Sequence, residues 1–142
     1  MTASRRFPRE IAALESVFEF TAEVLPDSAV SPALRRSVDF VLEEYFTNIV
    51  KYGGGTGAIG IDIDLSPGRV QVALTEPDAN RFDVTRVPPV DTTLPIEQRQ
   101  PGGLGLHLAR RLVDTLAYEY APDERRSRIT FTRARDSTCA IW

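Results

Sequence analysis

Glu44 and Asn48 are the first residues of this chain whose types and spacing suit a chemical role. They lie four residues apart in a stretch, Phe40–Tyr52, that has the apolar period of a helix. At about 100° of rotation per residue, both side chains fall at the edge of the apolar face, whereas Glu43 and Val50 fall on its opposite side. A carboxylate and an amide in this position suit a pocket that the helix shares with the element it packs on. The apolar face contains Leu34, Val38, Val41, Leu42, Tyr45 and Ile49.

The alternative interpretation of this pair is structural. Polar pairs at i, i+4 are common on helices. A boundary between a helix and a sheet, at which two polar residues are merely half exposed, would show the same spacing. The spacing alone therefore leaves both interpretations open.

A second stretch that suits a chemical role is the run Pro101-Gly102-Gly103-Leu104-Gly105-Leu106. Its glycines precede or open a predicted helix, and glycine lets another group approach the backbone closely. The free N–H groups and the positive dipole end of a helix start suit a phosphate. The alternative is a glycine-rich turn that only caps a core helix. The apolar residues of this predicted helix are Leu104, Leu108, Ala109, Leu112, Val113 and Leu116.

Taken together, the Glu-x-x-x-Asn helix and the later Gly-Gly-Leu-Gly-Leu helix start resemble two sequence boxes of the GHKL (Bergerat-fold) ATPases. The most specific part is Glu44-Tyr-Phe-Thr-Asn48-Ile-Val-Lys-Tyr-Gly53, followed by Gly102-Gly-Leu-Gly-Leu106. Within that superfamily the chain is similar to the anti-sigma-factor serine/threonine kinases of bacterial partner-switching systems. The resemblance covers roughly residues 5 to 133.

The resemblance implies a role for each matching residue. Glu44 corresponds to the base that polarises the attacking serine hydroxyl, and Asn48 to the residue that holds Mg²⁺ on the phosphates of ATP. These roles are physically sensible, because phosphoryl transfer depends mostly on positioning and charge neutralisation. Lys51 is expected near the phosphates, although a solvated lysine is the alternative. The remaining candidates are Gly103, Leu104 and Gly105, whose backbone N–H groups would bind phosphate, and Thr130, whose hydroxyl would lie near the adenine.

One box of the family does not match. The pattern expects Asp-x-Gly and then a Phe-Asp pair, which is present as Phe82-Asp83. Counting back from this pair places Pro77 at the aspartate and Ala79 at the glycine. That aspartate normally accepts a hydrogen bond from the adenine amino group. Either Glu76 or Asp78 replaces it through a shifted loop, or adenine recognition is weakened.

Length and composition restrict the class of protein. A chain of 142 residues fits one domain, 1–142, whose ordered core we expect over about 5–133. The net charge of −3 argues against a protein that binds nucleic acid directly through broad phosphate attraction. No apolar run is long enough to cross a membrane. A single cysteine, Cys139, and a single histidine, His107, give no Cys/His metal cluster. We expect a cytoplasmic protein.

The order of predicted elements indicates a two-layer α/β sandwich. Its sheet should be mixed but mostly antiparallel, with helices on one face. Ser31 and Pro32 mark the start of the second helix as N-cap and first-turn residue. The proline-rich segment 83–102 is expected to be a lid, since long loops in small domains are usually functional. The resemblance implies the Bergerat ATP-binding fold, with nucleotide between helices and sheet. We predict helices near 8–25, 31–52 and 104–116, a short edge strand at 5–7, and strands at 58–65, 70–75, 117–121 and 128–133.

Three functions remain open at this stage. The first is an ATP- and Mg²⁺-dependent kinase that phosphorylates a STAS-type anti-sigma antagonist and sequesters a sigma factor, with a homodimer as its candidate assembly. The second is a catalytically silent binding module of the same fold. The third is the catalytic domain of a histidine kinase, which we rank last because no dimerisation helix with a phosphoacceptor histidine precedes the domain. The intact Glu44 favours the first function, and the altered adenine box favours the second.

Overall fold

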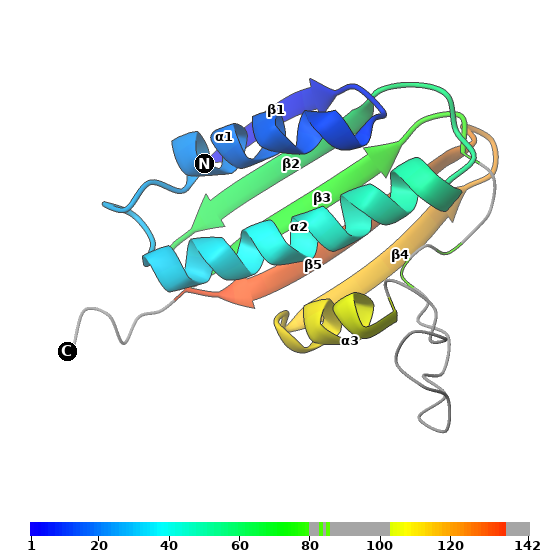
Figure 1. The fold of residues 1–142 in the computed structure, drawn as a ribbon. Coiled ribbons are helices and arrows are strands. Elements are labelled where there is room, and N and C mark those ends of the chain that lie inside the picture. Colours follow the sequence, from blue (N-terminus) through cyan, green and yellow to red (C-terminus); the bar gives the residue numbers. More distant parts are fainter. Residues whose placement is uncertain (80–82, 84, 86–102, 136–142) are drawn as a thin grey trace.

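The computed structural model, which describes residues 1–79, 83, 85 and 103–135, has two layers: a sheet, and helices that cover one face of it (Figure 1). Within the described residues the sheet has five strands in the order β1-β2-β3-β5-β4, and every neighbouring pair is antiparallel. The predicted two-layer α/β class is therefore confirmed, and no parallel pair occurs in this part of the chain. The strands are β1 (Thr2–Phe7), β2 (Ile59–Ser66), β3 (Arg69–Glu76), β4 (Thr115–Ala121) and β5 (Arg126–Ala134).

The helices pack on the sheet through apolar side chains that the sequence spaces regularly. Side chains alternate between the two faces of a strand, so Ile59, Ile61 and Ile63 all point to the helical face, where they are buried. The apolar face predicted for the central helix is buried against them. This helix, α2 (Pro32–Tyr52), lies over the middle of the sheet, between α1 and α3 (Figure 1). The other helices are the 3-10 helix η1 (Ile11–Ala13), α1 (Leu14–Val24) and α3 (Gly103–Arg111).

The start of α2 is fixed as predicted. The Ser31 hydroxyl accepts a hydrogen bond from the backbone N–H of Leu34 at 3.0 Å, and Pro32 is the first helical residue. Such an N-cap satisfies one of the N–H groups that a helix start leaves free. Gly53 is the C-cap residue. The helix boundaries that hold Glu44 and Asn48 in place are thus encoded locally.

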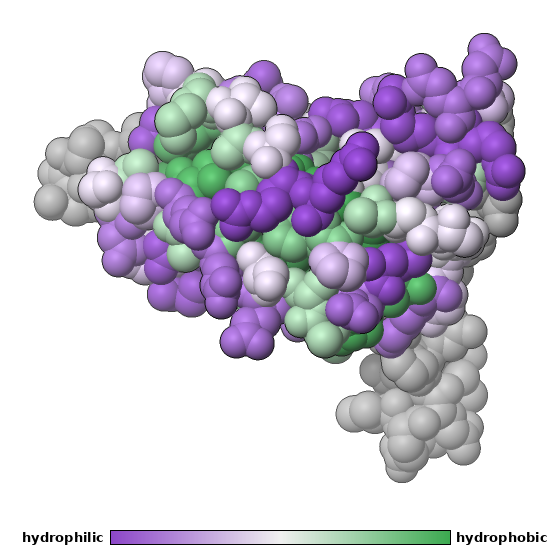
Figure 2. Space-filling model, turned by 90° about the horizontal axis from the view of Figure 1, so that it is seen from above, coloured by the Kyte–Doolittle hydropathy of each residue, from purple (hydrophilic) through white to green (hydrophobic). Residues whose placement is uncertain are grey.

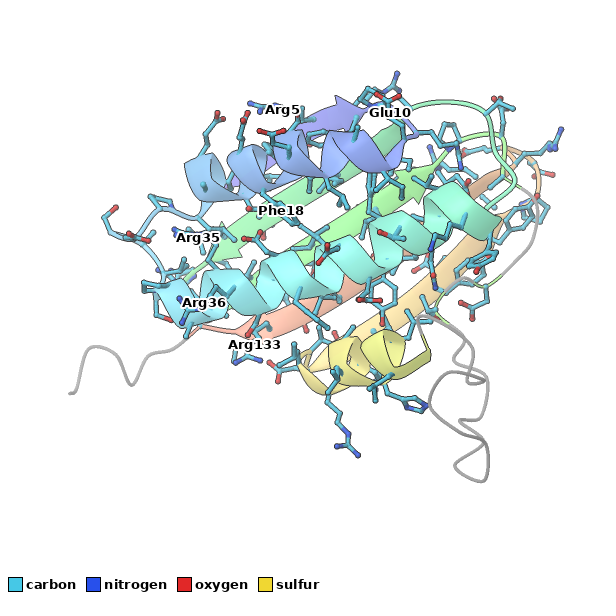
Figure 3. The ribbon with its side chains drawn as sticks, viewed as in Figure 1. Arg5, Glu10, Phe18, Arg35, Arg36 and Arg133 are labelled. Atoms are coloured by element: carbon cyan, nitrogen blue, oxygen red, sulfur yellow. The ribbon has the colours of Figure 1, made fainter. Side chains whose placement is uncertain are left out.

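Two predicted helix boundaries are corrected. The first helix was expected from residue 8, but a 3-10 turn precedes the α-helix, which starts at Leu14. The third was expected to reach residue 116, but it ends at Arg111 because the chain there is already tied to β5. Asp114 N–H donates to the Thr132 carbonyl at 2.8 Å, and Arg133, which lies near α3 in Figure 3, donates to the Leu112 carbonyl at 2.6 Å.

The face of the sheet without helices is polar. Two open hollows lie on it, and their lining includes Ser4, Asp62 and Arg128. The side of the molecule seen from above in Figure 2 is mostly hydrophilic, with smaller hydrophobic areas between. None of the described helices is long and apolar enough to cross a membrane. The segment predicted as a lid, 83–102, lies outside the described residues except for positions 83 and 85.

Candidate functional site

The two candidate motifs meet where the start of α3 lies beside α2. A Cβ atom built on Gly105 would lie 2.5 Å from Oε2 of Glu44 and 2.6 Å from its Cδ and Oε1. Ordinary van der Waals contacts of a Cβ atom begin at 3.4 Å. A Cβ atom here would force the carboxylate to move away, so glycine is what lets the helix backbone approach it this closely. The structure brings Glu44 and the glycine-rich helix start together, although they are far apart in the sequence.

The surroundings of Glu44 favour its protonated form. Partial burial raises the pKa of the Glu44 carboxyl above its ordinary value, and the negative charge of Glu43 raises it further. The positive charge of Lys51 opposes both effects. A carboxylate with a raised pKa is a stronger proton acceptor once it has ionised. The position and the electrostatics of Glu44 therefore suit a general base.

Asn48 lies one helical turn after Glu44 and is half-buried, whereas Lys51 is exposed. Among the described residues no group of three or more His, Cys, Asp and Glu side chains could hold a metal ion. Proteins usually bind Mg²⁺ through one or two side chains together with phosphate oxygens and water, so a site of this kind would not form such a group. The Asn48 amide oxygen beside the Glu44 carboxylate offers such a donor set.

The start of α3 supplies backbone donors. Gly103, Leu104 and Gly105 form its first turn, where the N–H groups have no partner within the helix.

Leu104 is exposed, and so is His107, which therefore lies at a polar surface position. Pro101 and Gly102 lie outside the described residues, as does Phe82. Asp83 is described, and its carboxylate accepts a hydrogen bond from the Thr85 N–H at 2.9 Å.

Glu76 lies beneath the C-terminal end of α2 in a buried polar network. Its side chain is 2% exposed and forms an ion pair with Arg9. It also accepts the Gly55 N–H at 3.2 Å and lies 3.5 Å from the Ser127 hydroxyl. A Cβ atom on Gly53 would lie only 2.7 Å from the Glu76 Cδ, so this glycine too permits a close approach.

The other members of the altered box lie elsewhere. Asp78 is exposed and, together with Pro77, lines a hollow on the face of the sheet without helices. Its φ of 53° is in the left-handed region that favours glycine. Ala79 is buried, and its carbonyl accepts a hydrogen bond from the Tyr120 hydroxyl at 3.0 Å. The left-handed conformation that favours glycine thus occurs at Asp78, two residues after Glu76, and not at Ala79.

The structure does not bring Thr130 to the other candidates. It pairs with Ala73 and Ala117, and it lies between Ile129 and Phe131, which point to the helical face. Thr130 therefore points to the opposite face of the sheet. The hydroxyl beside Glu76 belongs to Ser127, which sequence reasoning missed. Ser127, Ile129 and Phe131 follow one another at two-residue steps, and this alternation is the signal that could have found it.

Tyr45 is a second residue that sequence reasoning assigned only to the core. It is fully buried, and its ring lies 6.4 Å from that of Phe131, centroid to centroid. Its hydroxyl has no hydrogen-bond partner in the part of the chain that the structure describes. Burial raises the pKa of Tyr45 to about 12, while the charge of Arg110 acts in the opposite direction. Tyr45 thus places an unpaired polar atom in the core directly beside Glu44 in sequence.

These features agree with the comparisons with known proteins. The model of the histidine kinase-like ATPase domain family matches residues 7–133, and the chain belongs to this family. The predicted resemblance to GHKL ATPases is thereby confirmed. A search of curated proteins gave no significant match.

Solved structures share the fold at low sequence identity. One is that of the RsbU and RsbW domains of Rv1364c from Mycobacterium tuberculosis, with a TM-score of 0.65 and 16% identity over 94% of this chain. This chain spans only 32% of that one. Another is a chain of the SiaB–SiaC complex from Pseudomonas aeruginosa, with a TM-score of 0.59 and 19% identity, covering 93% of this chain and 89% of that one.

Proposed function

We propose that this protein is an ATP-dependent serine/threonine kinase that acts as an anti-sigma factor and phosphorylates a STAS-type antagonist. The observation that carries the proposal is the approach of the Glu44 carboxylate to Gly105. It joins a candidate base to the backbone donors of a helix start, which is where a phosphate binds readily. Membership of an ATPase-domain family supports ATP as the phosphate donor.

The residues of the site divide the proposed chemistry among them. Asn48 would hold Mg²⁺, which supplies charge neutralisation to the phosphates when it is bound. The N–H groups of the first turn of α3 would orient the phosphate oxygens. Glu44 takes the proton of a serine hydroxyl while that oxygen forms a bond to the γ-phosphorus and the bond from this phosphorus to the leaving ADP oxygen breaks. Lys51 would add positive charge near the same phosphates.

Glu76 is the residue we assign to adenine recognition. It is a carboxylate at the end of β3, on the helical face, with the Ser127 hydroxyl beside it. A carboxylate oxygen in this position can accept a hydrogen bond from the adenine amino group. Asp78 is the weaker candidate, because it points to the other face of the sheet. Thr130 is weaker than Ser127 for the same reason.

The comparisons support a protein partner. The fold occurs in a chain of the SiaB–SiaC complex and in a protein with RsbU and RsbW domains. We propose a STAS-type antagonist as the phosphorylated partner and a sigma factor as the sequestered one, in the cytoplasm, with a homodimer as the proposed assembly. These assignments extend the resemblance found in the sequence.

The test is the transfer of the γ-phosphate of ATP to a panel of STAS-domain antagonists. Wild type should phosphorylate one of them in the presence of Mg²⁺. Glu44→Gln should bind Mg·ATP normally and lose about 10²–10⁴ in rate, since it lacks the base. Asn48→Ala should lose Mg²⁺-dependent nucleotide binding. Equal transfer rates for wild type and Glu44→Gln at saturating Mg·ATP would remove Glu44 from the mechanism.

A catalytically silent binding module is the second candidate, and one observation favours it. Glu76 is buried and ion-paired, so one oxygen of its carboxylate, Oε2, is occupied within the protein itself. Calorimetric titration with Mg·ATP and Mg·ADP separates the two functions. Heat of binding that depends on Mg²⁺ and on Asn48 supports the kinase. No binding of either nucleotide supports the silent module.

A further inference from the structure

Arg9 connects three parts of the chain beneath the end of α2. Its Nε donates to the Gly57 carbonyl at 3.2 Å, and its Nη1 donates to the Ile49 carbonyl at 3.3 Å. The same Nη1 forms the ion pair with Oε2 of Glu76. The Arg9 side chain is 13% exposed. A guanidinium with a rigid fork of donors, bound in this way to two carbonyls, has little freedom to move.

The two oxygens of Glu76 have different surroundings. Oε2 accepts from Arg9 and also from the Gly55 N–H at 3.2 Å. Among the described residues, Oε1 has only the long contact of 3.5 Å with the Ser127 hydroxyl. A carboxylate oxygen can accept two hydrogen bonds, so Oε2 is saturated whereas Oε1 retains capacity. The network therefore fixes which oxygen remains available.

Stability alone explains this arrangement poorly. A buried ion pair is weak evidence for stabilisation, because removing both charges from water costs about as much as their attraction returns. The Nη2 atom of Arg9 is buried without a hydrogen-bond partner among the described residues, which adds a further cost. An arrangement that costs stability and orients a carboxylate is more readily explained by what the carboxylate binds.

We propose that Arg9 is a positioning residue for base recognition: it holds Oε2 of Glu76 and leaves Oε1 to accept an N–H donor from a 6-aminopurine nucleotide. This inference rests on the proposed function, in which Glu76 recognises adenine. Arg9 holds the Glu76 carboxylate in one orientation through the ion pair to Oε2. Without Arg9, the carboxylate is free to rotate, and the acceptor for the base is lost.

The experiment compares ATP with inosine triphosphate, which carries a carbonyl where adenine carries its amino group. Dissociation constants with Mg²⁺ are measured for wild type, Arg9→Met and Arg9→Lys. We expect wild type to prefer ATP by about tenfold or more, as for a hydrogen bond to a charged acceptor. Arg9→Met should bind both nucleotides about equally and keep the affinity of wild type for inosine triphosphate. Arg9→Lys keeps the charge but lacks the fork, so its preference should lie between the two.

Arg5→Met is the matched control. Arg5 also pairs with a glutamate, Glu23, at 3.0 Å, but this pair is exposed at the outer edge of the molecule beside α1 (Figure 3). The control should keep the preference of wild type. A thermal melt of each variant shows that it is folded. Should Arg9→Met fail to fold, Arg9→Lys decides the outcome, because a preference equal to that of wild type would overturn the inference.

Each other outcome also has a defined meaning. If Arg9→Met keeps the full preference or binds ATP more tightly, Arg9 is structural or competes with the base, and the inference is wrong. If wild type binds both nucleotides equally, the inference is wrong, but nucleotide binding through the phosphates stands. If wild type binds neither nucleotide, the proposed function fails and the inference fails with it.

Discussion

Replacing Gly105 by alanine should leave the stability of this protein intact and slow the proposed phosphoryl transfer. The added Cβ would lie 2.5 Å from Oε2 of Glu44, which is about 0.9 Å short of the 3.4 Å where ordinary contacts begin. The atoms in the way belong to the end of a flexible side chain that is only partly buried, so the carboxylate can move aside. In a helix interior alanine is favoured over glycine by about 1 kcal/mol, and in the first turn of α3, where Gly105 lies, the same preference acts with a smaller magnitude. We therefore expect the free energy of unfolding of Gly105→Ala to equal or exceed that of wild type.

The expected effect on phosphoryl transfer is the opposite. A displacement of about 1 Å of a positioned catalytic group can cost about 10²-fold in rate. Gly105→Ala should therefore transfer phosphate about 10²-fold more slowly than wild type, if the proposed kinase activity is correct. Urea unfolding gives the stability, and the rate is measured at saturating Mg·ATP.

Two other glycines serve as controls. Gly53→Ala would press its Cβ against Glu76, which is buried and held by Arg9, so this variant should be destabilised by about 1–3 kcal/mol. Gly68 has no atom within 4 Å of a built Cβ, and Gly68→Ala should change neither stability nor rate appreciably. The reasoning fails if Gly105→Ala is destabilised as much as Gly53→Ala, or if it folds normally and transfers phosphate at the rate of wild type.

Two further predictions concern Glu44 and Tyr45. The rate of transfer should rise with pH through the pKa of Glu44, which lies above the ordinary 4.5. Glu43→Gln should shift this rise to lower pH, because it removes a charge that raises the pKa of Glu44. A pH–rate profile in which Glu43→Gln shifts the rise to higher pH would contradict this. Tyr45→Phe should raise the free energy of unfolding by up to about 1 kcal/mol, because it removes a buried hydroxyl that has no partner among the described residues. A loss of stability in urea unfolding would show that this hydroxyl has a hydrogen-bond partner in solution.

Most of the fold could be predicted from local patterns in the sequence. The apolar period of α2, its Ser31 cap and the alternation of Ile59, Ile61 and Ile63 are local signals, and the structure follows all of them. The end of α3 could not be predicted in this way. Apolar residues at helical spacing continue to Leu116, but the strand pairing of Leu116 with Phe131 decides its conformation. That pairing joins residues distant in sequence, and helical spacing carries no information about it.

The candidate site shows the same division. The spacing of Glu44 and Asn48 placed both at the edge of the buried face of α2, and both are half-buried. The approach of Glu44 to the start of α3 depends on tertiary packing and was inferred through the resemblance to a family. The contacts of Arg9 could not be inferred from spacing at all, because its partners Ile49, Gly57 and Glu76 lie in α2, in the loop after α2 and in β3. Only the folded chain shows which cation meets which buried carboxylate.

The position of the glycine in the altered adenine box gives a final prediction. Counting along the sequence assigns this position to Ala79, whereas the backbone assigns it to Asp78, whose φ is 53°. A residue other than glycine in this conformation costs roughly 1 kcal/mol, and less for aspartate. Asp78→Gly should therefore leave the free energy of unfolding unchanged or raise it by up to about 1 kcal/mol, after the greater freedom of glycine in the unfolded chain is included.

Ala79→Gly should have the opposite effect. Ala79 is fully buried, and its N–H donates to the Arg125 carbonyl at 2.7 Å. Removing its methyl group loses about 0.8 kcal/mol of burial, and the added freedom of glycine costs roughly another 0.5–1 kcal/mol. Urea unfolding of the two variants should thus give changes of opposite sign. If Ala79→Gly raised the free energy of unfolding and Asp78→Gly lowered it, the alignment counted from Phe82-Asp83 would be the correct one. Glu76 would then not occupy the position of the aspartate that binds the adenine amino group.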